Sequence, residues 1–140
     1  MGGRLTIIGG GVMGLMAAYY AAPLANAVTV LERSRVGDPA TASFGLTRSV
    51  RNDYRDPAVD VVTASGVDTC WYDLVADDEF ILGAVPGADG LYTGVGWRGT
   101  GYKFAPWVGR VLAQLALQRG TVYDIGRFTP ARFAAEGVAS

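Results

Sequence analysis

Histidine is absent from this 140-residue chain, cysteine and lysine occur once each, and neither sign of charge dominates. The absence of histidine excludes Ser-His-Asp and Cys-His nucleophilic sites and disfavours a zinc centre. A single cysteine, Cys70, forms no intrachain disulfide, which favours a reducing, cytoplasmic location. Acid–base chemistry is therefore left to carboxylates, lysine, tyrosine or a bound cofactor.

The charge balance, 12 basic against 13 acidic residues, offers no electrostatic footprint for nucleic acid or an anionic membrane. No apolar run is both long enough and poor enough in glycine to span a bilayer. Half of the residues are hydrophobic, so a chain of this length can bury the core of one ordinary domain. We therefore expect a single α/β domain over residues 1–140, without a metal.

The apolar run 5–22 admits a second interpretation. With Arg4 before it and the small residues 25–27 after it, the run resembles a secretory signal peptide. Four glycines interrupt it, however, and a β-branched segment ending in an acid follows, which a signal peptide does not require. These features favour a folded segment over an export signal.

Strand, glycine turn, helix and strand succeed one another within about thirty residues, the length of a βαβ unit. Residues 4–8 and 27–31 are short and apolar and predict two buried strands. Between them, residues 12–24 are rich in Ala, Leu and Met and predict a helix that Pro23 ends. The two strands would form a short parallel sheet.

The rest of the chain predicts a hairpin and a C-terminal helix. Residues 37–39 indicate a turn, and a second helix is expected over 41–51. Strands over 79–84 and 91–95 flank Pro-Gly and Asp-Gly turn signals. The last helix begins near Pro106, shows apolar residues at helical spacing and is expected to stop at Gly120. The tail, residues 124–140, is expected to be extended.

Residues 9–14 read G-G-G-V-M-G, the G-x-G-x-x-G pattern. Gly9 permits the sharp turn, Gly11 allows a pyrophosphate to approach the backbone, and Gly14 lets the helix pack closely on the strand. The helix N-terminus favours the phosphates, and Glu32, at the end of the second strand, is placed to bind ribose hydroxyls. The predicted dinucleotide site comprises Gly9, Gly11, Val12, Met13, Gly14, Glu32 and Arg33.

This pattern leaves two alternatives open. A glycine-rich packing turn beside a solvated glutamate would show the same residues, although the strand, the helix and the distant acid together favour nucleotide binding. The glycine motif also does not distinguish NAD from FAD.

Three further segments resemble monomeric sarcosine oxidase, N-methyltryptophan oxidase and their relatives, which are flavoenzymes of the D-amino-acid-oxidase-like superfamily. Residues 42–51 (A-S-F-G-L-T-R-S-V-R) are similar to their SSxGxTRxxR stretch. Residues 70–73 (C-W-Y-D) and 77–82 (D-D-E-F-I-L) resemble their C-x-Y and PDExFxI segments. Residues 96–106 (G-W-R-G-T-G-Y-K-F-A-P) resemble their GxxGxGxKxAP loop.

The resemblance implies FAD as the cofactor and assigns roles to individual residues. Arg48 would lie near the flavin ring, and Arg51 and Lys103 would hold the carboxylate of the substrate. Cys70 falls where these oxidases carry the cysteine that bonds covalently to flavin; a buried small hydrophobe is its alternative role. Further cofactor contacts are implied for Ser43, Thr47, Gly99, Thr100, Gly101, Tyr102 and Lys103.

The resemblance covers two blocks, residues 4–56 and 70–133, joined by the shortened junction 57–69. Family members carry a long central region here, so the substrate domain is expected to be largely absent. Trp71, Trp97 and Trp107 are then expected on or near surfaces that this region covers, and such an apolar patch favours a homodimer.

The implied reaction is oxidation of a secondary amine beside a carboxylate, as in an N-alkyl amino acid, with the flavin reoxidised by O2. Two alternatives stay open. One is a non-catalytic FAD-binding or interaction module, and the other is an internally deleted product without turnover.

Overall fold

The structure, a computed structural model, describes residues 2–39, 41–43 and 73–136. Its first unit has β1 (Arg4–Ile8), α1 (Val12–Ala21) and β2 (Ala27–Leu31), and the two strands pair in parallel with every residue of β1 opposite its counterpart in β2. The predicted βαβ unit is thus confirmed. α1 ends at Ala21, before the Leu24 that we predicted, because Pro23 has no N–H group with which to continue the helical hydrogen bonds.

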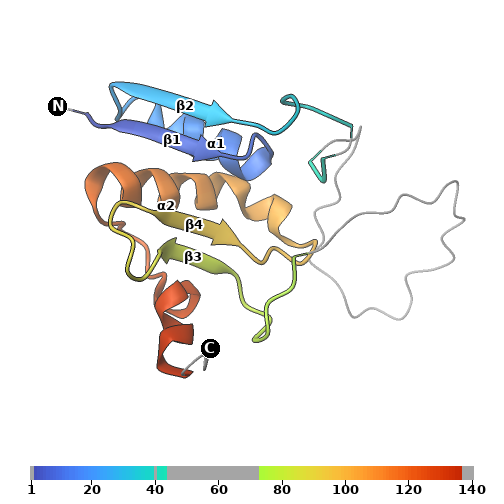
Figure 1. Cartoon of the computed structure of the whole chain (residues 1–140), viewed down its shortest axis with the longest axis vertical. Helices are drawn as coiled ribbons and strands as arrows, with labels where there is room; N and C mark the ends of the chain where they lie inside the picture. Colours follow the sequence, from blue (N-terminus) through green and yellow to red (C-terminus); the bar gives the residue numbers. More distant parts are fainter. Residues whose placement is uncertain (1, 40, 44–72, 137–140) are drawn as a thin grey trace, which may run out of the picture.

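Only one face of the parallel pair is covered among the described residues. Half-buried and exposed residues alternate along both strands, and α1 packs on one side (Figure 1). The opposite face carries Ile8, which is 85% exposed, and Leu31, which is 52% exposed. Parallel sheets are normally covered on both faces, so within the described part of the chain this unit has an unusually open side.

The second sheet is the predicted hairpin. β3 (Ile81–Ala84) pairs antiparallel with β4 (Tyr92–Val95). The connecting turn contains Gly87 and Gly90, both with a φ of 76°, a left-handed conformation that glycine adopts without steric cost. The Pro-Gly and Asp-Gly signals therefore mark the turn correctly.

α2 (Ala105–Gln118) packs on the hairpin and contributes to the buried hydrophobic core. Pro106 lies in its first turn, as predicted. The side chains of Leu82, Val108 and Val111 are fully buried together, and aromatic residues surround them. The i, i+3 spacing of the two valines places them on the same face of the helix.

The C-terminus of α2 differs from the prediction. The helix ends at Gln118, and the left-handed residue that follows is Arg119, with a φ of 56°. Gly120 was expected to stop the helix, but the left-handed position falls one residue before it. A non-glycine residue in this conformation is uncommon, and the glycine therefore does not supply the helix cap.

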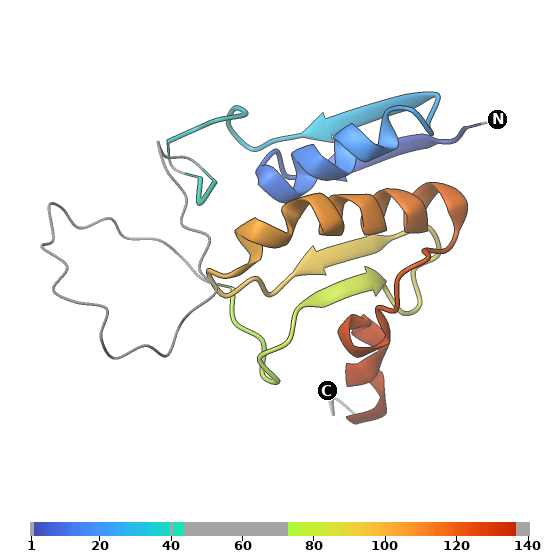
Figure 2. The same cartoon turned by 180° about the vertical axis from the view of Figure 1, so that it is seen from behind.

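The two units meet through their helices, which lie side by side between the two sheets (Figures 1 and 2). Gly109 of α2 makes this approach possible. A Cβ atom at this position would lie 2.5 Å from the carbonyl carbon of Met16 and 2.7 Å from the amide nitrogen of Ala17, both in α1. The order through the molecule is therefore parallel pair, α1, α2 and hairpin.

The C-terminal segment is helical where we predicted an extended tail. It forms two 3₁₀ helices, η2 (Gly126–Phe128) and η3 (Pro130–Glu136). The ring of Phe128 packs against Trp107 and Phe80, at centroid distances of 5.9 Å and 6.1 Å. Burial of these rings gives the segment the tertiary contacts that its local sequence pattern does not reveal.

Two of the three tryptophans take part in the packing of the hairpin–α2 unit. Trp97 and Trp107 are half-buried and pack against the core cluster, and their expected place on or near surfaces that longer relatives cover stays a prediction. Trp71 lies outside the described residues. Among the helices of the described part of the chain, none has the length and apolarity needed to cross a membrane.

Candidate functional site

The glycine turn after β1 has the geometry that its motif predicts. Gly9 has a φ of 105°, and its amide donates to the carbonyl of Leu31 at 2.8 Å, which joins the turn to the end of β2. A Cβ atom on Gly14 would lie 1.9 Å from the carbonyl oxygen of Gly9. The third glycine is therefore required for the close packing of α1 on the strand.

The N-terminus of α1 faces the same end of the sheet as this turn (Figure 1). Gly11 is the N-cap residue, and no acidic side chain lies in the first turn of the helix. The amide of Val12 donates to the hydroxyl oxygen of Ser43 at 2.9 Å. The structure thus brings Ser43, which was singled out by resemblance alone, to the helix end where backbone N–H groups and the helix dipole attract anions.

Glu32, which follows β2, is hydrogen-bonded to the glycine turn that follows β1. Its Oε2 accepts from the amide of Gly10 at 2.6 Å, and its Oε1 accepts from Ser34 at 3.3 Å. The bond from Gly10, followed by that from Ser34, lowers the pKa of the Glu32 carboxyl. A carboxylate has about four acceptor positions, so Glu32 retains capacity for further hydroxyl donors. Arg33, the next residue, is exposed.

The second glycine-rich segment, residues 96–103, joins β4 to α2. Gly96, Arg98 and Gly99 have φ values of 82°, 49° and 73°. The carbonyl of Trp97 accepts from the amides of Thr100 and Gly101 at 2.8 Å and 3.1 Å. The loop therefore folds back on itself before the 3₁₀ turn η1 (Gly101–Phe104).

One contact joins the two glycine-rich segments. A Cβ atom on Gly101 would lie 2.6 Å from Cβ of Trp97 and 3.1 Å from Cε of Met13. Met13 belongs to the first turn of α1, so the loop lies against the glycine motif although almost ninety residues separate them. Predicted cofactor residues from both blocks of the sequence therefore share one region, at the carboxyl ends of β1, β2 and β4.

The remaining predicted residues of the loop lie at its far end. Tyr102 is 40% exposed, and Lys103 is half-buried with its Nζ 5.3 Å from the centroid of the Phe104 ring. Thr100 is exposed, and its hydroxyl donates to the carbonyl of Trp97 at 3.1 Å. Outside the described residues lie the predicted second helix beyond Ser43 and four predicted site residues, Thr47, Arg48, Arg51 and Cys70.

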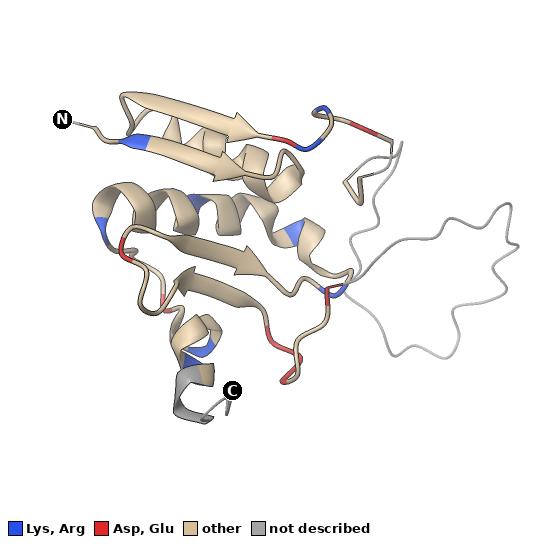
Figure 3. Cartoon of the chain, in the orientation of Figure 1, with Lys and Arg blue, Asp and Glu red and all other residues tan. Residues whose placement is uncertain are grey.

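Among the described residues, the acidic residues gather in the connecting segments, whereas basic residues also lie on strands and helices (Figure 3). In the segment before β3, Asp77, Asp78 and Glu79 pair with Arg132, Arg98 and Arg127, respectively. Sequence reasoning used these acids only as part of a motif. It missed the pairing because the three arginines are distant in the sequence.

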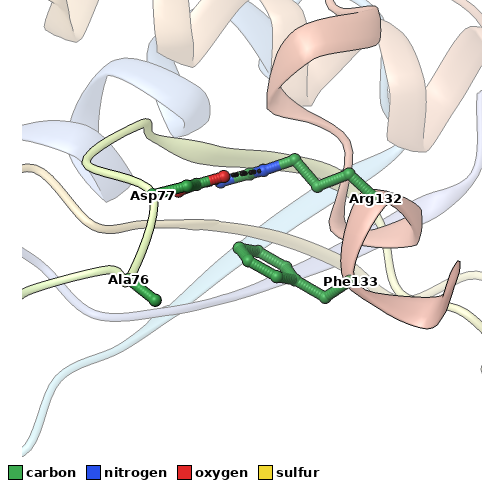
Figure 4. A pocket seen from close by; sticks show the side chains of 4 residues that line it. All are labelled: Ala76, Asp77, Arg132 and Phe133. Atoms are coloured by element: carbon green, nitrogen blue, oxygen red, sulfur yellow. Dashed lines mark hydrogen bonds and ion pairs between the residues drawn. The ribbon is translucent and has the colours of Figure 1, made fainter. Parts of the chain in front are cut away.

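The Asp77–Arg132 pair borders an open hollow that Ala76 and Phe133 also line (Figure 4). Arg132 donates from Nε and Nη2 to the two carboxylate oxygens, at 2.6 Å and 3.0 Å. The bond from Arg132 holds the pKa of Asp77 at about 2, below its ordinary value of 3.8. No predicted site residue lines this hollow.

Asp73 is a further residue that the sequence analysis did not single out. Its carboxylate accepts from the amides of Gly96 and Trp97, at 2.5 Å and 3.0 Å. The available signal was an acid next to the C-x-Y segment, but only tertiary structure shows that it binds the glycine loop.

Comparison with known proteins finds similar sequences for part of this chain. Residues 4–66 match the FAD dependent oxidoreductase family. The chain is 31% identical to human peroxisomal sarcosine oxidase over 107 residues, which are 76% of this chain and 26% of that protein. No solved structure gives a significant match.

Two bacterial relatives match over shorter stretches. Monomeric sarcosine oxidase of Streptomyces avermitilis is 40% identical over 68 residues, covering 48% of this chain and 18% of the relative. N-methyl-L-tryptophan oxidase of Salmonella arizonae is 35% identical over 65 residues, covering 46% and 18%. The chain thus spans about a quarter, or less, of the length of these relatives.

The family whose model matches this chain is thus that of FAD dependent oxidoreductases, and the match extends over residues 4–66, a little under half of the chain. Within that class, the chain is homologous over part of its length to sarcosine and N-methyltryptophan oxidases, as its motifs indicated.

Proposed function

We propose that this chain binds FAD at the region shared by the glycine turn and the loop of residues 96–103. The observation that carries the proposal is the contact of Met13 with Gly101, which brings together two segments that the resemblance independently assigns to the cofactor. The match of residues 4–66 to the FAD dependent oxidoreductase family supports FAD over NAD.

The described residues fit the ADP half of such a cofactor. A Cβ atom on Gly11 would lie 3.2 Å from the Ser43 hydroxyl, so a side chain there would fill the space over the start of α1. The absence of an acid from the first turn leaves the helix N-terminus attractive to a pyrophosphate. Glu32 would accept from ribose hydroxyls while the amide of Gly10 keeps its carboxylate ionised.

The flavin half would lie toward the 96–103 loop. Gly99 is exposed and has no side chain, which permits close approach of the backbone to a ring, whereas Gly101 is buried against Trp97 and Met13. When bound, FAD supplies hydride acceptance and reoxidation by O2. Lys103 would offer an ammonium charge to the carboxylate of an amine substrate, and Arg48 and Arg51 are proposed to assist it.

The proposed reaction is oxidation of a secondary amine that lies next to a carboxylate. Covalent attachment through Cys70 and assembly of a homodimer in the cytoplasm belong to the same proposal. FAD binding without turnover is the alternative. An oxidase assay with sarcosine and other N-methyl amino acids distinguishes the two, because turnover releases H2O2 whereas binding alone does not.

The first experiment is an absorbance spectrum of the purified protein, followed by acid precipitation. Flavin bands that remain with the pellet support the Cys70 link, whereas flavin in the supernatant supports binding without it. Protein that stays colourless after reconstitution with FAD contradicts the proposal.

A Glu32→Gln variant tests the site within a folded protein. We expect FAD affinity to fall roughly tenfold, because a charged hydrogen-bond acceptor is lost. Asp89→Asn removes an equal charge from the hairpin turn and is expected to leave FAD affinity unchanged. Equal effects of the two variants would contradict a specific role for Glu32.

A further inference from the structure

The carboxylate of Asp73 binds two consecutive backbone amides at the start of the 96–103 loop. It accepts from Gly96 at 2.5 Å and from Trp97 at 3.0 Å. Hydrogen bonds to an ionised acceptor are roughly twice as strong as neutral ones. Asp73 thus holds the loop across 23 positions of sequence, through the backbone rather than through a side chain.

The turn that Asp73 holds is sterically demanding. Gly96 is buried with a φ of 82°, and a Cβ atom there would lie 2.4 Å from Cγ2 of Val75. Arg98 also has a positive φ, of 49°, which costs free energy in a non-glycine residue. A backbone of this kind persists only when surrounding interactions stabilise it. Here the hydrogen bonds to Asp73 and the Arg98–Asp78 ion pair, at 3.1 Å, are such interactions.

This turn determines where the rest of the loop lies. The amide of Trp97 binds Asp73, while its carbonyl accepts from Thr100 and Gly101. The side chain of Trp97 lies against Gly101, and Gly101 lies against Met13 at the start of α1. A continuous series of contacts therefore links Asp73 to the glycine turn.

We propose that Asp73 is a positioning residue that sets the backbone of residues 96–103 for contact with the flavin ring. The inference rests on the proposed FAD function and adds a residue to it. Asp73 acts through the amides of Gly96 and Trp97 and does not touch the cofactor itself. Loss of its carboxylate therefore weakens FAD binding and changes the environment of the bound ring.

The test compares three variants of the full chain after reconstitution with FAD. Asp73→Ala removes both acceptors, and Asp73→Asn keeps one carbonyl oxygen. Asp77→Asn is the matched control, because Asp77 lies in the same segment and also makes two short bonds, but to the Arg132 side chain. Unfolding curves first establish a temperature at which all the proteins are folded, and FAD titrations and flavin absorbance spectra are recorded there.

We expect the FAD dissociation constant to rise roughly tenfold in Asp73→Ala and less in Asp73→Asn, in line with the number of acceptors lost. At saturating FAD, the flavin bands of Asp73→Ala should be displaced from those of the wild-type protein. Asp77→Asn should lower the unfolding temperature while leaving affinity and spectrum unchanged. A purely structural role for Asp73 would not move the spectrum at saturation.

Two results would overturn the inference in distinguishable ways. If wild-type protein binds FAD and Asp73→Ala binds it with equal affinity and an identical spectrum, the positioning role is wrong while the proposed function stands. If folded wild-type protein binds no FAD, the proposed function fails, and the role of Asp73 toward flavin fails with it.

Discussion

The parallel β1–α1–β2 unit and the hairpin–α2 unit are stabilised in different ways. In the first unit, close packing depends on a residue without a side chain, because Gly14 allows α1 to approach the backbone of the turn. One face of its sheet is exposed among the described residues. In the second, Leu82 and two valines are fully buried, and salt bridges fasten the flanking segments. Because hydrophobic burial dominates folding, we infer that the hairpin–α2 unit contributes more to stability.

This difference explains where the candidate site lies. The unit with the smaller core supplies the glycine turn, and the unit with the larger core supplies the 96–103 loop. A ligand that contacts both would stabilise their junction, because ligand binding to the native state raises its stability. The following predictions test the contrast, beginning with the largest expected effect.

Leu82→Ala should destabilise the protein far more than Ile8→Ala. Leu82 is fully buried, and its truncation leaves a cavity that costs about 3 kcal/mol. Ile8 is 85% exposed, so its truncation should change the free energy of unfolding by less than about 0.5 kcal/mol. Urea unfolding of both variants measures the difference. Similar losses would contradict the contrast between the two units.

Gly109→Ala tests the junction between α1 and α2. The added methyl group would meet the backbone of Met16 at 2.5 Å, and overpacking of this kind costs about 2 kcal/mol. Gly120→Ala is the control, because nothing lies within 4 Å of its Cβ position. Thermal unfolding should show a lower transition only in Gly109→Ala, and an unchanged transition would mean that the helices separate freely.

Ser43→Ala should destabilise the first unit modestly. The hydroxyl of Ser43 accepts from the amide of Val12 at the start of α1, and loss of such a cap costs about 1 kcal/mol. Ser34→Ala removes a hydroxyl whose partner is Asp38 in an exposed loop, and is expected to cost less. Denaturant unfolding without FAD provides the measurement. A larger effect in Ser34→Ala would contradict the capping role.

The Asp77–Arg132 pair should produce the smallest effect on stability, and that effect should disappear in acid. The folded pKa of Asp77 is about 2, below the ordinary 3.8, so its stabilising contribution is complete above pH 3.8 and is lost as the pH falls toward 2. Unfolding curves between pH 5 and pH 2 should therefore be less pH-dependent in Asp77→Asn than in wild-type protein. Identical pH dependence would indicate that solvent screens the pair.

Sequence patterns predicted most of the elements. β1 and β2 were placed with the observed bounds, because apolar strands beside a glycine turn carry a strong local signal. The hairpin was also predicted, from its two glycine-containing turn signals. Errors arose at α2, whose left-handed end is Arg119 rather than Gly120, and in the tail, where aromatic packing accompanies 3₁₀ helices.

The candidate site also contains residues that the sequence predicted and residues that it did not. The glycine motif and Glu32 were predicted, and the structure joins them through the Gly10 bond. Asp73 was missed because its partners are backbone amides 23 and 24 positions away, and a backbone amide has no sequence signature. The roles predicted for Arg48, Arg51 and Cys70 stay predictions.

The sequence by itself determined the order of strands and helices, the conformation of the Gly9 turn and the homology to FAD-dependent oxidoreductases, since each depends on residues close together in the chain. Only the tertiary structure decided which segments meet. Three contacts join residues that are far apart in the chain. Gly109 packs on α1, Gly101 lies close to Met13, and Asp73 accepts hydrogen bonds from the 96–103 loop. Such contacts are set by the shape of the folded core, which no local pattern encodes.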